Sequence, residues 1–101
     1  MPAQFRVEIS ASAERDLEEI WDYIAQDNPG NATSFILQLE KQIYSLELSP
    51  DRCSLIPENL ILGTSCRHLI HGQYRAIFRV ATDSVYILRI IHGARLLEDI
   101  L

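Results

Sequence analysis

The chain has 101 residues, of which 48% are hydrophobic, and its formal net charge is −5. This length suits a single domain spanning residues 1–101, and the hydrophobic content is sufficient for a core and too high for a disordered chain. The acidic balance disfavours tight autonomous binding to RNA or DNA, since that binding draws its affinity from a basic surface. No stretch approaches the roughly 18 apolar residues of a transmembrane helix, and residues 1–6 lack the apolar run of a signal peptide. We therefore expect a soluble cytoplasmic protein with no membrane association.

Charge is unevenly distributed along the chain, and the cysteines and histidines show no metal-binding pattern. Residues 1–60 carry eleven acidic and four basic side chains, a balance of −7, whereas residues 61–101 carry five arginines and three acids, a balance of +2. A solvated acidic helix face combined with scattered strand arginines is the simplest explanation. Cys53 and Cys66 form no C-x-x-C motif, and the three histidines show no ligand spacing. The sequence therefore predicts reduced, structural cysteines, no metal and no cofactor.

The first half of the chain predicts a strand and two helices. Residues 4–9 alternate polar and apolar, as in a half-buried strand. Ser10 is a suitable N-cap for an amphipathic helix over residues 11–27. Residues 28–31, Asn-Pro-Gly-Asn, break this pattern, and a second helix is predicted over 31–48, the pair forming an antiparallel hairpin. The apolar stripes of the two helices are Ala13, Leu17, Ile20, Trp21 and Ile24, and Ala32, Phe35, Ile36, Leu39, Ile43 and Leu46.

The second half predicts a long connection and three strands. The connection spans residues 49–63, and the strands cover about 65–70, 73–80 and 84–92. The two short separations between these strands favour antiparallel hairpins. The expected order is β-α-α-β-β-β, an α+β fold in which the helical hairpin packs on one face of a mainly antiparallel sheet.

The strand over residues 73–80 has two chemically different faces. Tyr74, Ala76, Phe78 and Val80 alternate with Arg75, Ile77 and Arg79. We expect the first set to meet the helices and the second to face away, with Arg67 joining it if the preceding hairpin is in simple register. Such a face suits a solvated surface, a substrate floor or a docking site. Arginines among apolar residues are typical of interface centres, which favours docking.

Several motifs occur in order along nearly the whole chain. They are Ala13-x-x-Asp16-Leu17-x-x-Ile20-x-x-Tyr23-Ile24, then Leu46-x-x-Ser49-Pro50, then Arg67, Tyr74-Arg75 and Phe78-Arg79, and finally His92-x-x-Arg95. Together they resemble the RelE/ParE superfamily, the toxins of bacterial type II toxin–antitoxin modules, and the ParE branch in particular. The resemblance implies a small toxin held inactive by a cognate antitoxin that wraps it, with operator DNA bound only through the antitoxin. ParE members are described as poisoning DNA gyrase, and RelE members as cleaving mRNA on the ribosome.

The residues of this chain bear on the choice between gyrase poisoning and mRNA cleavage. Cleaving RNA requires a group that accepts the 2′-hydroxyl proton, a cation for the transition state and an acid for the leaving oxygen. Arg67, Arg75 and Arg79 are candidates for the charge, and His92 is the only late acid or base. The resemblance implies that a RelE-like enzyme uses basic residues on the sheet and, commonly, a tyrosine or histidine near the C-terminus. This chain has no tyrosine after residue 86, and its one lysine lies in a predicted helix. This departure from the RelE pattern favours a ParE-like, gyrase-binding toxin without its own chemistry.

Two alternatives stay open. One is a ribosome-dependent RNase whose catalytic residues are His92, Arg75 and Arg79, with Arg67 holding phosphate. The other is a non-toxic or decayed toxin that serves as an autoregulatory module with its antitoxin. Under the preferred hypothesis an apolar and acidic antitoxin segment lies over the groove of the helical hairpin and over the sheet, and its acids meet Arg67, Arg75 and Arg79. Residues 96–101, with four large apolar side chains, are expected to dock on the core or on a partner. The candidate partner-binding or target-binding residues are Arg67, Arg75, Ile77, Arg79, Arg89, His92 and Arg95.

Overall fold

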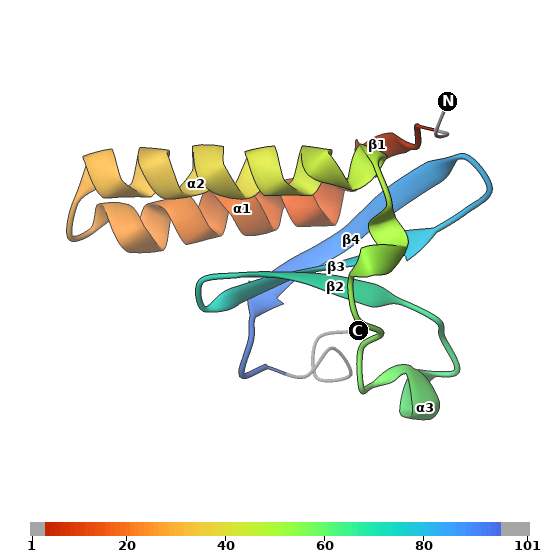
Figure 1. Ribbon diagram of the computed structural model, residues 1–101. Coiled ribbons are helices and arrows are strands. Elements are labelled where there is room, and N and C mark those ends of the chain that lie inside the picture. The colour runs from red at the N-terminus through yellow and green to blue at the C-terminus, as the bar shows by residue number, and fades with distance from the viewer. Residues whose placement is uncertain (1–3, 96–101) are drawn as a thin grey trace.

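A four-stranded sheet carries a helical hairpin on one face in the computed structural model, which describes residues 4–95 (Figure 1). The sheet order is β1-β4-β3-β2; β1 runs parallel to β4, and the other pairs are antiparallel. This arrangement confirms the expected α+β fold. Within the described part of the chain, no helix is long and apolar enough to cross a membrane. The main elements are β1 (Arg6–Ile9), α1 (Ala11–Ala25), α2 (Pro29–Tyr44), β2 (Arg67–His71), β3 (Tyr74–Val80) and β4 (Ser84–His92).

Side-chain caps fix where the two long helices begin. The Ser10 hydroxyl accepts the Ala13 N–H at 3.0 Å, and Asn28 Oδ1 accepts the Asn31 N–H at 3.0 Å. The predicted break over residues 28–31 was too long: α2 begins at Pro29, because proline is well suited to the first helical position, where its missing N–H has no partner to lose. The second helix also ends earlier than predicted, and Ser45–Glu47 form a 3₁₀ turn, η1.

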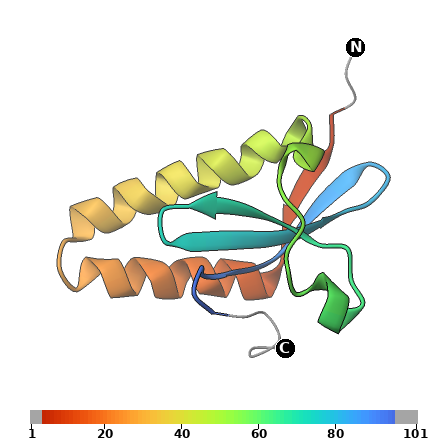
Figure 2. The same ribbon diagram turned by 60° about the horizontal axis from the view of Figure 1, so that its bottom comes forward.

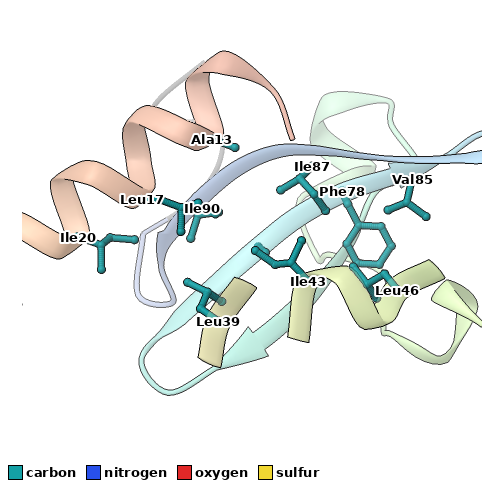
Figure 3. Close-up of a cluster of buried hydrophobic side chains, with 11 residues drawn as sticks. Ala13, Leu17, Ile20, Leu39, Ile43, Leu46, Phe78, Val85, Ile87 and Ile90 are labelled. Carbon is teal, nitrogen blue, oxygen red and sulfur yellow. The ribbon is translucent and has the colours of Figure 1, made fainter. Parts of the chain in front are cut away.

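The main core lies between the helical hairpin and the sheet. Ala76 and Phe78 of β3 are fully buried there, so the predicted helix-facing side of this strand is confirmed for both, whereas Val80 at its end is 39% exposed. Trp21, predicted as core, is 36% exposed, and its Nε1 donates to Thr33 Oγ1 at 3.2 Å across the hairpin. Figure 3 shows the core side chains of the helices and strands pointing toward one another. The buried members are Ala13, Leu17, Ile20, Leu39, Ile43, Leu46, Ala76, Phe78, Val85, Ile87 and Ile90.

A second, smaller core lies on the other face of the sheet. The connection after α2 contains the 3₁₀ turn η2 (Pro50–Arg52) and the short helix α3 (Asn59–Leu62). Its Ile56 packs with Cys66, Ile77 and Ile91 in a buried cluster. In both ribbon views α3 lies away from the α1–α2 turn (Figures 1 and 2). The expectation that Ile77 lies on an open sheet face was therefore wrong, because the connection covers it completely.

Candidate functional site

Arg75 is buried, although the strand pattern placed it on an open binding face. Its two terminal nitrogens are paired with the carboxylate of Glu58, which belongs to the covering connection; Nη1 lies 3.2 Å from Glu58 Oε1. Nη2 also donates to the carbonyl of Arg95 at 2.7 Å. Arg75 and Glu58 are only 5% and 3% exposed. The prediction of an accessible Arg75 was wrong because a carboxylate distant in sequence neutralises it.

His68 completes this buried polar cluster. Its Nδ1 lies 3.2 Å from Arg75 Nη1, a distance at which the neutral ring accepts a hydrogen bond. Burial lowers the pKa of His68, the charge of Arg75 lowers it further, and Glu58 acts in the opposite direction. The cluster therefore favours a neutral His68 that serves as an acceptor for Arg75.

Arg89 fastens α1 to the sheet. Its Nε donates to Asp16 Oδ2 at 2.8 Å, and its Nη2 donates to Asp16 Oδ1 at 3.0 Å. Asp16 Oδ2 also accepts the Ile90 N–H at 2.8 Å. The hydrogen bonds to Asp16 raise the pKa of Arg89. The Asp16-Leu17 pair of the first-helix motif thus has a structural role, which the sequence-based assignment of Arg89 to a binding surface missed.

Arg67 does not join Arg75 on one face. The β2–β3 hairpin pairs Arg67 with Phe78 and Ile70 with Arg75, and residues paired in an antiparallel ladder project to the same side of the sheet. Arg67 therefore lies on the side of Phe78, and its Nη1 donates to the carbonyl oxygens of Cys53, at 2.5 Å, and Asp51, at 3.3 Å. Its role in the fold is to fasten the connection to β2.

The other candidates, Arg79, His92 and Arg95, are exposed. The guanidinium of Arg79 lies 4.4 Å from the centroid of the Tyr86 ring, a cation–π contact. The His92 Nδ1 accepts the Ala94 N–H at 3.2 Å, the backbone contact expected of a strand-end histidine.

Arg79 and His92 lie near opposite ends of the β3–β4 ladder. His92 pairs with Tyr74, five residues before Arg79 on β3, which corresponds to roughly 17 Å along a strand. The structure therefore does not bring the two together.

A groove lined by β1, α1 and α2 lies at the helical hairpin, where the sequence-based hypothesis placed the antitoxin segment, but its acidic lining was not predicted. Its apolar lining comes from Ile9, Leu17, Trp21, Ile36 and Tyr44. Its polar lining consists of three acids, Glu14, Glu18 and Glu40, and contains no basic residue. The helical spacing of these acids places them beside the apolar stripes, so the sequence contained the information needed to predict an acidic lining. Among residues 4–95, no group of three or more His, Cys, Asp or Glu side chains gathers in a way that could hold a metal ion.

The fold belongs to a class found in toxin–antitoxin systems. A chain from the chromosomal ParDE system of P. aeruginosa superposes with a TM-score of 0.68 at 23% identity, covering 88% of this chain and 96% of that one. A chain from the RelBE2 toxin–antitoxin complex of Mycobacterium tuberculosis superposes with a TM-score of 0.65 at 20% identity, covering 89% and 99%.

The sequence itself identifies the family. The family model of the ParE toxin of the type II toxin–antitoxin system parDE matches residues 7–97. This chain therefore belongs to the ParE toxin family, within the RelE/ParE superfamily. No curated protein matches it.

Proposed function

We propose that this toxin is neutralised by a cognate antitoxin and acts in the cytoplasm by binding and poisoning DNA gyrase, without cleaving RNA itself. The observation that carries the proposal is the scattering of the residues that RNA cleavage would use. A general acid or base must lie within hydrogen-bond reach of the proton it transfers, and the stabilising cation must meet the same phosphate. Arg75 is buried against Glu58, and Arg79 lies roughly 17 Å along the strand from the position of His92.

The exposed basic residues fit a role in binding better than a role in chemistry. Arg79, His92 and Arg95 each present polar groups at the surface, and Arg79 is supported by the Tyr86 ring. An arginine held by an aromatic ring loses little conformational freedom on binding, which suits an interface contact. We assign these three residues to partner or target binding, and we assign Arg67, Arg75, Ile77 and Arg89 to the fold.

The groove of the helical hairpin is the proposed antitoxin site. An amphipathic segment placing apolar side chains between Trp21 and Tyr44 would bury surface that is now partly exposed. Because the polar lining is formed by Glu14, Glu18 and Glu40, the matching segment should carry lysine or arginine beside its apolar residues. This replaces the sequence-based expectation of an apolar and acidic segment at the hairpin. Operator DNA would be reached only through the antitoxin.

Expression of the toxin in growing bacteria, with and without the adjacent antitoxin gene, tests the proposal. Toxin alone should arrest growth and produce gyrase-linked DNA breaks, and co-expression should yield a complex and restore growth. Primer extension on translated mRNAs should show no new cuts. Cuts that vanish in His92→Ala would establish the RNase alternative, whereas a complex without any growth defect would establish the non-toxic, autoregulatory one.

A further inference from the structure

Helix α3 exposes two adjacent large aliphatic side chains. Leu60 is 96% exposed and Ile61 is 72% exposed. We infer that this pair, the α3 knob, is an anchor that inserts into an apolar, uncharged pocket on the protein that the toxin acts on. This inference rests on the proposed function, in which toxicity comes from binding to a target protein.

The chain segment that carries the knob contains almost no charged residues. Across residues 53–66 the sequence contains a single charged residue, Glu58, in a chain that is 23% charged overall. Glu58 does not reach solvent, because its carboxylate is buried against Arg75. Depletion of charge around exposed apolar side chains distinguishes the centre of a protein interface from ordinary surface. The knob therefore matches a partner surface that is apolar and uncharged.

The outward direction of the knob is fixed by contacts on the other side of α3. The Asn59 side chain donates from Nδ2 to the carbonyl of Cys66 at 2.9 Å, and its Oδ1 accepts the Cys66 N–H at 2.9 Å. Leu62 packs against the small core beside Ile77, and Gly63, with φ at 66°, ends the helix in the left-handed conformation. Because Asn59 and Leu62 are held inward, Leu60 and Ile61 cannot turn into the core. A rigidly presented side chain loses little entropy on binding, as an interface anchor requires.

A target protein is a better occupant than a second copy of this chain. Even an aromatic side chain buries only about 150–250 Å², so two aliphatic ones fall far short of the roughly 800 Å² per partner of a standard interface. A convex knob also offers no cavity to a second knob. It can contribute only as one part of a larger interface, in which the partner supplies the concave surface.

The antitoxin is also a poorer occupant than the target. The proposed antitoxin groove is lined by Glu14, Glu18 and Glu40 and calls for a basic segment, whereas the knob calls for an uncharged one. Leu62 of α3 packs on the core opposite the helical hairpin, so a segment seated in the groove leaves the knob uncovered (Figure 1). The knob therefore remains available for the target.

The test compares the full-length toxin with Leu60→Ser/Ile61→Ser and with a matched control, Tyr23→Ser/Leu37→Ser, whose side chains are 69% and 61% exposed on the helices. Each is assayed for growth arrest, for poisoning of purified gyrase, for antitoxin affinity and for melting temperature. We expect the knob variant to need about tenfold more protein for the same arrest and poisoning, with unchanged melting temperature and antitoxin affinity. The control should match the wild type.

The possible outcomes separate this inference from the proposed function. If wild type arrests growth without touching gyrase and the knob variant relieves the arrest, the knob inference stands and the gyrase proposal fails. Equal potency of knob variant and wild type overturns the knob inference, whichever target is involved. Three other outcomes also overturn the knob inference. The knob variant could lose antitoxin affinity while keeping its potency, or it could lose a dimer that the wild type forms. The wild type could also fail to arrest growth at all.

Discussion

The Arg75–Glu58 pair shows how one carboxylate converts a candidate binding arginine into part of the core. Both side chains are almost fully buried, and Arg75 also binds the Arg95 carbonyl. Ion pairs in this setting add little net stability over apolar substitutes, but removing one partner leaves a buried charge without compensation. The pair therefore joins the connection to β3, and loss of either partner should destabilise this contact.

Glu58→Gln should lower the free energy of unfolding by about 3–5 kcal/mol, because it removes the counter-charge of a buried guanidinium while keeping the side-chain volume. The double variant Glu58→Leu/Arg75→Met should recover most of this loss, since no charge then remains buried. Urea unfolding followed by circular dichroism measures both. A loss below about 1 kcal/mol in Glu58→Gln would show that the pair is not a buried unit.

His68 should make the stability of the domain sensitive to mild acid. Folding lowers the pKa of His68 from its ordinary value of 6.5, so the unfolded chain binds the proton more readily. Stability should therefore be fully present above about pH 6.5 and decline as the pH falls below it. The melting temperature of the wild type should drop more between about pH 7.5 and 5.5 than that of His68→Asn, which keeps an acceptor without titrating. Parallel pH curves for the two proteins would contradict this role of His68.

At the scale of elements, local signals in the sequence predicted the regular structure well. Three of these signals depend only on neighbours within a few residues. They are the Ser10 cap, the helical spacing of Leu17 and Ile20, and the alternation of polar and apolar residues along β3. The connection over residues 49–63 has no such period. Its η2 turn follows Ser49 with φ at 51°. Its α3 is held by Asn59, which bonds Cys66 seven residues away, and by Glu58, which pairs with Arg75 seventeen residues away. Neither contact belongs to a repeating pattern, so the sequence predicted only a long loop.

The acidic lining of the α1–α2 groove should contribute to antitoxin binding. Glu18→Lys/Glu40→Lys should weaken antitoxin binding about tenfold, because the proposed segment places basic residues beside those carboxylates. Asp22→Lys, also exposed on α1 but outside the groove lining, serves as the control and should bind as the wild type does. Titration calorimetry at low salt measures both. Tighter binding of the reversed-charge variant would show that the antitoxin segment is acidic, as the sequence first suggested.

At the scale of the whole molecule, the candidate site was only partly predictable. Alternation along β3 correctly separated Arg75 from Phe78, but the hairpin register placed Arg67 with Phe78, and the connection covered Arg75 and Ile77. Register and long-range cover depend on which segments meet in space, and local patterns in the sequence do not reveal this. Residues 96–101, expected to dock on the core or on a partner, lie outside the described residues.

The relative positions of the basic residues across the whole molecule support the proposed binding role. Arg79 and His92 lie near opposite ends of the β3–β4 ladder, and Arg75 and Arg89 are engaged by Glu58 and Asp16. Within residues 4–95, the separation of Arg79 from His92 supports the proposed role in binding. The proposed antitoxin groove lies at the helical hairpin, and the proposed α3 knob lies beside the smaller core on the other face of the sheet.

The most direct measurement is a cleavage assay with purified gyrase, supercoiled plasmid and increasing amounts of the toxin, run beside a purified translation reaction containing the same toxin. Linear DNA should accumulate in proportion to toxin, antitoxin should abolish this accumulation, and the translated mRNA should stay intact. Intact plasmid together with mRNA cut at codons, with the cuts lost in His92→Ala, would rule out gyrase poisoning and establish an RNase.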